Sequence, residues 1–425
     1  MTTPYRRGTD VQPRSRTGKL LRVAAWLALI LLVLAGPNIV FYFKWMHPDE
    51  SIPPVDDRID QLASTEATAA LGFGTILHEA RAGAGLPSMS GAIGYGGTVQ
   101  WAGAVGYSDI ESRTPATLRS RYRLGSTSKA LTGVLLARLV DAGQVDVDAP
   151  ISSQVQGMPA HLAPLTARQL VSHSGGVRHY SMPAWWLGWW EMYSNQPFNS
   201  VDEGLSLFRD DKLLFTPGEG FNYSTFGYSL LSRLMEGASG MDFPRLLEEQ
   251  LFMPADMQDS DVDRAGEMPR RVSFYSADSG RFTPDYPTDS SYKIAGGGMV
   301  STPVDLVRLG IRLLGSGFVS DAGKQLLWTP MLLSDGAPNP QNYAAGWRID
   351  TSERLLGAGD PTLIFHHGGT QAGGAAFFML VPEYDMAVAV VSNSGTGTAR
   401  SAVQETAYEL VRRALASKQV ASPHD

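Results

Sequence analysis

A serine and a lysine three residues apart could together perform nucleophilic chemistry. Residues 124–132 read Leu-Gly-Ser-Thr-Ser-Lys-Ala-Leu-Thr, which places Ser126 and Lys129 at the start of a largely apolar run. Positions i and i+3 share one face of a helix, so the hydroxyl and the amine are expected side by side at a helix start. A serine needs a base to become a good nucleophile, and burial or positive charge can make a lysine that base. A simple N-cap is the alternative role for Ser126.

The same spacing occurs a second time, at Ser290 and Lys293. This copy leads into three glycines at 296–298, and because glycine is unfavourable inside a helix, no regular helix is expected to begin there. The copy at Ser126 precedes a run that is apolar on most sides and ends at Gly143, which is typical of a buried helix. The first copy is therefore the better candidate.

A tyrosine on a glycine-rich loop is the next candidate. Residues 217–230 read Pro-Gly-Glu-Gly-Phe-Asn-Tyr-Ser-Thr-Phe-Gly-Tyr-Ser-Leu, which holds Tyr223 just before a predicted helix. Its phenol could relay a proton if positive neighbours lower its pKa. The alternative is an ordinary half-buried aromatic side chain.

A pair of histidines ends a predicted strand near the C-terminus. Residues 364–374 read Ile-Phe-His-His-Gly-Gly-Thr-Gln-Ala-Gly-Gly, and the glycines would let a substrate approach the backbone and leave an N–H free as a donor. A metal site built from His366, His367, His173 and His179 is disfavoured, because adjacent side chains on a strand point to opposite faces. We expect no metal and no other cofactor.

These motifs, in this order, resemble the serine β-lactamase and penicillin-binding-protein family, in its class C and esterase branch. Ser126-Thr127-Ser128-Lys129 matches the Ser-x-x-Lys motif, Tyr223-Ser224-Thr225 matches Tyr-x-Asn except at the last residue, and His366-His367-Gly368 stands where β-lactamases carry Lys-Thr-Gly. Segments 170–180, 296–302 and 345–347 also fit. The segments His-Ser-Gly-Gly-Val-Arg-His-Tyr and Tyr-Ser-Thr-Phe-Gly-Tyr are most similar to the mitochondrial β-lactamase-like branch.

The resemblance implies an acyl-enzyme mechanism with assigned roles. Ser126 would attack the carbonyl, Lys129 and Tyr223 would share the base and the proton relay, and His366 would line the active-site strand. The backbone N–H groups of Ser126 and Gly369 would form the oxyanion hole. The expected residues on the substrate side are Gly368, Gly369, Thr225 and His367.

Two departures from the family pattern bear on the substrate. Thr225 replaces an asparagine that orients the lysine and the substrate amide, and His366 replaces a lysine that supplies positive charge for a β-lactam carboxylate. We therefore expect cleavage of a peptide, amide or ester, with weak or no β-lactamase activity. The alternatives are an inactive membrane-anchored scaffold, or a D-amino-acid-specific peptidase or carboxypeptidase acting on cell-wall peptides. The Gly-x-Ser-x-Gly elbow of α/β-hydrolases is absent from the sequence.

The charge is unevenly distributed along the 425 residues. Residues 1–22 contain six basic side chains and one acidic one, while the whole chain carries −7, so the remainder sums to −12. So acidic a body is a poor binder of nucleic acid. The chain has no cysteine, which excludes disulfides and thiol catalysis.

An apolar segment, Val23–Phe43, follows this basic tail and is long enough to span a bilayer. The basic flank predicts that the N-terminus stays in the cytoplasm and that the body lies on the extracytoplasmic, periplasmic or extracellular, side. We favour a single-pass membrane anchor over a cleaved signal segment. The expected organisation is a basic tail at 1–22, the anchor at 23–43, a polar linker at 44–62, one hydrolase domain at 63–418 and a tail at 419–425.

The body reads as an α+β fold of the β-lactamase/transpeptidase-like type. Strands are predicted near both of its ends, and helices between them. The natural arrangement is one antiparallel sheet built from both ends, with an inserted helical region that places Ser126 at the boundary. The strands are expected at 91–95, 99–107, 362–366, 374–381 and 386–391, and the helices at 66–81, 166–172, 224–237, 243–250, 303–315 and 398–415.

Four tryptophans, Trp185, Trp186, Trp189 and Trp190, form a dense cluster in the predicted helical region. A core corner, an apolar substrate wall, a membrane contact and a subunit interface are the alternatives for them. A homo-oligomer is compatible with the sequence.

Overall fold

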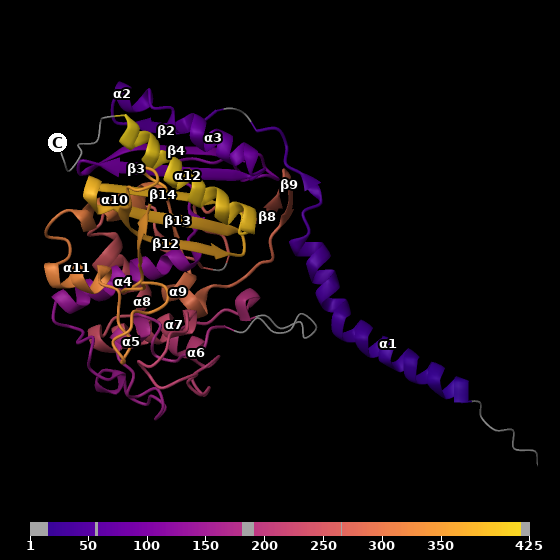
Figure 1. Cartoon of the computed structure of the whole chain (residues 1–425). Helices are drawn as coiled ribbons and strands as arrows, with labels where there is room; N and C mark the ends of the chain where they lie inside the picture. Colours follow the sequence, from indigo (N-terminus) through magenta and orange to yellow (C-terminus); the bar gives the residue numbers. More distant parts are fainter. Residues whose placement is uncertain (1–15, 56–57, 181–190, 265, 418–425) are drawn as a thin grey trace, which may run out of the picture.

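The computed structural model describes residues 16–55, 58–180, 191–264 and 266–417. The Trp185–Trp190 cluster lies outside the described residues. A large antiparallel sheet occupies one half of the body, and most of the helices gather in the other half (Figure 1). This division confirms the predicted α+β, β-lactamase/transpeptidase-like fold.

The main sheet joins strands from both ends of the body, as predicted. Its order is β11-β12-β13-β14-β3-β4-β2, and β14 pairs with β3 in a register that sets Val390 against Gly91. The strands are β2 (Asp60–Ala63), β3 (Ser88–Tyr95), β4 (Thr98–Asp109), β11 (Arg348–Ser352), β12 (Thr362–Gln371), β13 (Gly374–Val381) and β14 (Met386–Ser392), with β5 (Thr114–Pro115) paired to β4.

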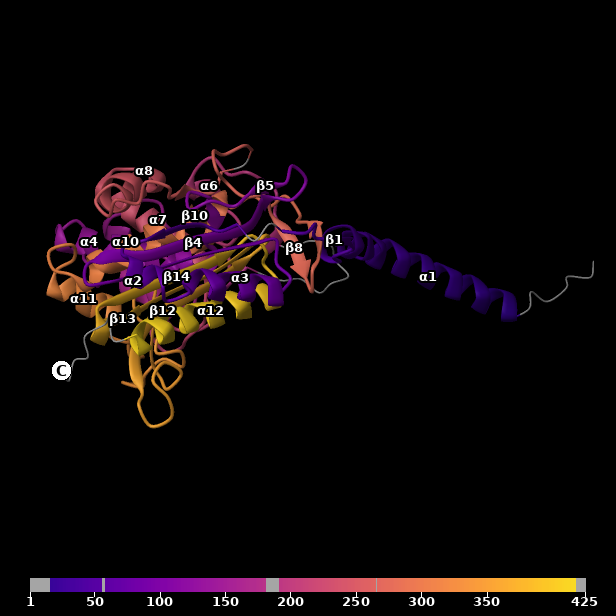
Figure 2. The ribbon, with the colours of Figure 1, turned by 90° about the horizontal axis from the view of Figure 1, so that it is seen from above.

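The central strands are apolar along their whole length because both faces of the sheet are covered. Alternate residues of β14 divide between two cores, with Ala387 and Ala389 in one and Val388 and Val390 in the other. Helices α3 (Phe73–Gly83) and α12 (Gly397–Ala416) cover the second face, and α10 (Pro303–Leu314) covers the first (Figure 2).

The inserted helical region packs on the same side as α10. Its helices are α4 (Ser128–Asp141), α5 (Ala167–Val171), α6 (Val201–Leu205), α7 (Thr225–Ser239), α8 (Phe243–Leu247), α9 (Ile294–Gly297) and α11 (Asp321–Trp328). The short helix α2 (Glu66–Ala69) lies outside this region, just before α3. Two small sheets, β6-β10-β7 and β1-β9-β8, complete the fold. Their strands are β1 (Glu50–Ser51), β6 (Tyr122–Arg123), β7 (Asp261–Val262), β8 (Tyr275–Asp278), β9 (Arg281–Pro284) and β10 (Met299–Ser301).

Several predicted boundaries differ from the structure, each for a local reason. The helix expected at 66–81 is two helices, because Gly72 adopts a left-handed φ of +71° between α2 and α3. Strand β12 does not end at the histidine pair but continues through the two glycines to Gln371. The second Ser-x-x-Lys copy is followed by only a single helical turn, α9, rather than by a regular helix.

The N-terminal segment forms one long helix that extends away from the body (Figure 1). Helix α1 (Arg16–Phe41) continues into a π-helical turn at Tyr42–Met46, and Lys19–Met46 is long and apolar enough to cross a membrane. A signal sequence would have the same length and composition.

The expected linker at 44–62 is not a free spacer in the structure. Strand β1 pairs with β9 and β2 pairs with β4, so both halves of this segment are built into sheets of the body. The rings of Phe41 and Trp45 lie 5.0 and 5.6 Å from that of Tyr286, which places the end of the apolar helix directly against the body.

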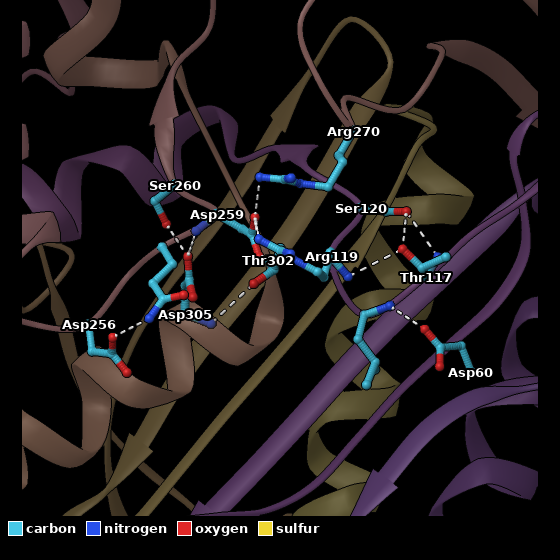
Figure 3. Close-up of polar contacts among 12 residues, drawn as sticks. Asp60, Thr117, Arg119, Ser120, Asp256, Asp259, Ser260, Arg270, Thr302 and Asp305 are labelled. Carbon is cyan, nitrogen blue, oxygen red and sulfur yellow. Dashed lines mark hydrogen bonds and ion pairs between the residues drawn. The ribbon is translucent and has the colours of Figure 1, made fainter.

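An ion-pair network holds the segment that leads into β6 and the Ser126 turn (Figure 3). The Asp259 carboxylate pairs with Arg119 at 2.9 Å and with Arg270 at 2.6 Å. The Asp259 backbone N–H donates to the carboxylate of Asp305, which lies in the first turn of α10 behind the N-cap Thr302. The network therefore ties the approach to the nucleophile turn to the N-terminal end of α10.

Candidate active site

Ser126 lies in a tight 3₁₀ turn, Gly125–Thr127, which runs directly into α4. The turn requires glycine at position 125, where φ is +50° and a Cβ would lie 2.8 Å from the backbone nitrogen of Thr370. Ser126 is half-buried, whereas Lys129, one turn later, is fully buried. The serine hydroxyl is thus presented at the helix start, and the lysine lies beneath it.

The amine of Lys129 faces three oxygen atoms. Its Nζ lies 2.6 Å from the carbonyl of Gly296, 3.1 Å from Thr225 Oγ1 and 3.4 Å from Ser126 Oγ. Burial lowers its pKa well below the usual value, and the positive charges of Arg348 and Lys293 lower it further.

A neutral amine has two hydrogens and one lone pair, which fixes the direction of these contacts. The Gly296 carbonyl can only accept, so it takes one N–H of Lys129. If Thr225 Oγ1 accepts the second N–H, the lone pair is left for the hydroxyl hydrogen of Ser126. This arrangement can remove the serine proton without any carboxylate.

Tyr223 lies on the loop before α7, with Lys129 Nζ 4.8 Å from the centre of its ring. Burial raises the pKa of the Tyr223 phenol to about 12, although the Ser126 side chain and the charge of Arg348 oppose the rise. The positive charge of Arg348 acts in the expected direction, but burial outweighs it, so Tyr223 is a neutral phenol that can donate and accept a proton in relay.

Two histidines, the buried His173 and the half-buried His179, fix the start of α7, and sequence reasoning had not given them this role. His173 Nδ1 accepts the backbone N–H of Ser224, and His179 Nδ1 accepts that of Thr225, both at 3.1 Å. These N–H groups have no partner within the helix, so the histidines satisfy them. His173 adopts a left-handed φ of +65°, an uncommon conformation that brings its ring 4.3 Å from that of Tyr223.

The two histidines of β12 face different surroundings. His366 Nε2 lies 2.8 Å from a carboxylate oxygen of Asp350. His367 is buried, and its Nδ1 donates to the Gly368 carbonyl while its Nε2 accepts from the hydroxyl of Tyr343 at 3.0 Å. Thus His366 lines the cavity described below, and His367 contacts Tyr343 behind the site.

An arginine that we had not singled out supplies positive charge to the site. Arg348 begins β11, donates to Gln341 Oε1 at 2.8 Å and lies 3.4 Å from His367 Nε2. Its guanidinium lies over the rings of Tyr223 and Tyr343, at 5.6 and 5.5 Å. Burial of His367 lowers the pKa of its imidazole well below the usual value, and the charge of Arg348 lowers it further, so this histidine is neutral.

The backbone of β12 packs directly against the nucleophile turn. A Cβ on Gly369 would lie 1.9 Å from the Leu124 carbonyl and 2.9 Å from the Ser126 nitrogen, so only glycine fits there. The His367 carbonyl accepts from Thr127 Oγ1 at this edge, and residues two apart on a strand present their backbone groups to the same side. The N–H of Gly369 therefore points to the edge beside Ser126.

A cavity of about 410 Å³ opens over this arrangement. Ser126 and Tyr223 lie in its wall with Gln341 and Arg348, and alternate residues of β12 form the floor. Its lining residues are Ser126, Tyr223, Gln341, Arg348, His366, Gly368, Thr370, Ala376, Phe377, Arg400 and Gln404.

The second Ser-x-x-Lys pair does not form a comparable site. Ser290 is buried, and its hydroxyl has no hydrogen-bond partner among the described residues. Within the part of the chain that the structure describes, no group of three histidines or carboxylates is arranged to hold a metal ion.

The chain is similar in sequence and in fold to several known proteins. The chain is 26% identical to the human "Serine beta-lactamase-like protein LACTB, mitochondrial" over 391 residues, which cover 72% of this chain and 71% of that protein. A D-amino acid amidase from Ochrobactrum anthropi SV3, solved with L-phenylalanine amide, superposes with a TM-score of 0.65 at 22% identity, covering 84% of this chain and 100% of that one.

An octameric penicillin-binding protein homologue from Pyrococcus abyssi superposes with a TM-score of 0.63 at 23% identity, covering 82% of this chain and 78% of that one. The beta-lactamase family model matches residues 73–413, which include the Ser126 turn, Tyr223 and the whole of β12. The protein therefore belongs to the beta-lactamase family of serine hydrolase folds.

Proposed function

We propose that the protein is a serine hydrolase that forms an acyl-enzyme on Ser126. The observation that supports this most directly is the fully buried Lys129 amine, which lies 3.4 Å from the serine hydroxyl and within hydrogen-bond distance of two other oxygens. An amine held neutral by burial and by nearby cations is the base that a serine nucleophile requires.

Acylation then proceeds in two steps. Ser126 Oγ bonds to the substrate carbonyl carbon as its proton passes to Lys129, and the carbonyl oxygen takes up negative charge at the N–H groups of Ser126 and Gly369. The intermediate collapses when the bond to the leaving group breaks. The leaving nitrogen or oxygen receives the Tyr223 phenol proton, and the Lys129 ammonium restores that proton to the phenol.

Deacylation uses the same groups in reverse. Water attacks the ester carbon and gives its proton to the Lys129–Tyr223 pair, the bond to Ser126 Oγ breaks, and the serine regains its proton. The products are a carboxylic acid and free enzyme. His366 and His367 line or support the β12 wall in this proposal and transfer no proton.

The substrate class that we propose is a peptide, amide or ester rather than a β-lactam. Thr225 stands in place of the asparagine amide, and His366 is held by Asp350. The cavity also contains Arg348 and Arg400, which can receive an anionic group on the substrate. We expect p-nitrophenyl esters and amino acid amides to turn over faster than nitrocefin, and a cephalosporin kcat/KM of about 10⁴ M⁻¹s⁻¹ or more would contradict this.

Covalent labelling tests the nucleophile. A fluorophosphonate should modify the wild type at Ser126, as mapped by mass spectrometry, and Ser126→Ala should remove both labelling and turnover. Ser290→Ala is the matched control and should leave the label in place. A label on Ser290 or Ser174 would reject the assignment.

The configuration of the substrate can be measured directly. The likeness to a D-amino acid amidase suggests comparing D- and L-phenylalanine amide as substrates. Faster turnover of the D-amide would favour a peptidase of D-amino-acid bonds, the alternative drawn from the sequence, and equal rates would exclude that preference.

We further propose that Lys19–Met46 anchors the body to a membrane on its extracytoplasmic side. Protease added to spheroplasts should digest the body and spare the first 20 residues. A soluble mature form that begins near Gly36 would show that the segment is a cleaved signal instead.

A homo-oligomer is the last part of the proposal, based on the likeness to an octameric homologue. Light scattering of the detergent-solubilised protein should give a mass that is a multiple of 45.9 kDa. A mass of one chain would contradict it.

A further inference from the structure

A second lysine is buried behind the active site. Lys293 is 4% exposed and directly precedes α9, whose Gly296 carbonyl accepts the Lys129 amine. A Cβ on Gly297 would lie 3.7 Å from the Gly125 backbone and 4.0 Å from Lys293 Cδ. Gly297 therefore lies between the Lys293 side chain and the nucleophile turn.

The Lys293 amine has few polar neighbours. Its Nζ lies 3.5 Å from the Met192 carbonyl, 5.2 Å from the Tyr292 ring and 5.8 Å from the Tyr180 ring. No ion pair joins it to a carboxylate within the described ranges, and residues 181–190 contain no aspartate or glutamate in the sequence. Its charge is not neutralised by a direct partner.

The ionisable groups around Lys293 do not offset this charge. Asp263 already pairs with Arg123 at 2.7 Å and Arg271 at 3.1 Å, and Asp289 accepts from the Ser291 backbone N–H at 2.8 Å. The charge of Arg123 on β6 acts on the Lys293 amine. The charge of Lys293 in turn acts on His179, after α5, and on Lys129 of α4. Among the described residues, neither carboxylate forms an ion pair with Lys293.

We propose that Lys293 is a positioning residue whose buried positive charge keeps Lys129 in its unprotonated form and so sets the acidic limit of serine acylation. The inference rests on the proposed function, in which Lys129 is the base. Two like charges in one desolvated region cannot both persist, so the charge on Lys293 makes protonation of Lys129 more difficult.

The protonation behaviour of Lys293 fits this role. Burial and the charge of Arg123 lower the pKa of Lys293 to about 7, although Asp263 and Asp289 oppose the shift. Below about pH 7 Lys293 is therefore charged, and its repulsion opposes the protonation of Lys129 in the acidic part of the activity profile.

The test is the pH dependence of fluorophosphonate labelling in the full chain, measured as a second-order rate from pH 4 to pH 9. Lys293→Met keeps the unbranched side chain and removes the charge, so the acidic limb should move upward by about one pH unit, as expected for a lost neighbouring charge. Lys324→Met, which removes a lysine of α11, is the matched control and should leave the limb unchanged.

A purely structural role for Lys293 would lower the rate by the same factor at every pH without moving the limb, and that result would overturn the inference. If Lys293→Met does not fold, Lys293→Arg keeps a charge at all pH values. Its limb should then stay at or below the wild-type position, and an upward shift would overturn the inference. Wild-type protein that fails to label at Ser126 would instead reject the proposed function.

Discussion

In the proposed mechanism Lys129 and Tyr223 share one path for the proton of Ser126, since the Lys129 amine lies 3.4 Å from the serine hydroxyl and 4.8 Å from the centre of the Tyr223 ring. Residues that act as a unit lose activity together, so their losses are not additive. We expect Lys129→Ala, Tyr223→Phe and the double variant to lower kcat/KM with p-nitrophenyl acetate by similar factors, each about 10²–10⁴. Strict additivity of the two single losses would count against a shared relay.

The pH dependence of kcat/KM should reflect the protonation of Lys129 and Tyr223. Activity requires the neutral Lys129 amine, so it should fall at acidic pH, below the lowered pKa of that lysine. Because the pKa of Tyr223 is raised to about 12, the phenol stays protonated, and it should cause no loss of kcat/KM between pH 8 and pH 10. A basic limb in this range that disappears in Tyr223→Phe would show that the phenol loses its proton far earlier.

At the level of single residues, the sequence predicted what local spacing determines. Ser126 and Lys129 come together because they are one helical turn apart. Arg348 could not be found this way, because its neighbours come from positions 341, 343 and 367, which only the fold brings together. The capping histidines likewise act on α7 from 46 and 51 residues away in sequence.

Helix α4 and strand β12 meet at their backbones, and this contact depends on one missing side chain. We expect Gly369→Ala to reduce thermal stability strongly and to abolish labelling, because its Cβ would lie 1.9 Å from the Leu124 carbonyl. Backbone atoms at that distance must move, which separates the strand from the nucleophile turn.

The adjacent glycine provides the matched control. A Cβ on Gly368 would make ordinary contacts, the nearest 3.5 Å away on Phe377, so Gly368→Ala should leave the melting temperature within a few degrees of wild type. Equal losses of melting temperature in the two variants would show that the effect is general to glycines of β12.

Secondary structure was predictable where apolar periodicity and turn residues agreed. Helices α10 and α12 and strands β13 and β14 lie within a few residues of their predicted positions. The predicted boundaries were wrong at glycines, because a glycine can either end an element or continue it. Gly72 breaks a helix through its positive φ, whereas Gly369 continues an extended strand in which the neighbouring backbone leaves no room for a side chain.

For the whole molecule, the attachment of α1 is the feature to test. A chain that begins at residue 47 removes the apolar helix but keeps β1 against β9, and we expect it to be soluble, to label at Ser126 and to melt near the temperature of the full chain. Strand β1 pairs through only two residues, so a start at residue 58 should lower stability slightly, by about 1 kcal/mol. Loss of labelling in the longer fragment would show that the catalytic body depends on α1.

The arrangement of the sheet was predictable from strands at both ends of the body, but the role of the 44–62 segment was not. Its proline and acidic residues read as a spacer, and its partners lie far along the chain, since the Asp49 N–H donates to the Phe282 carbonyl. The composition of a short segment does not predict pairing with a strand that is distant in the sequence.

The pairing of β14 with β3 also dictates when the protein can fold. Gly91 and Val390 are neighbours in the sheet but roughly 300 residues apart in the chain, so contact order is high and loop closure is costly. At ribosomal rates of ~5–20 residues per second, β3 has an unpaired edge for on the order of tens of seconds before β14 is made. The nascent chain therefore passes through a stage in which an apolar strand edge must be shielded from aggregation, and Ser126, already synthesised, cannot yet be an active nucleophile.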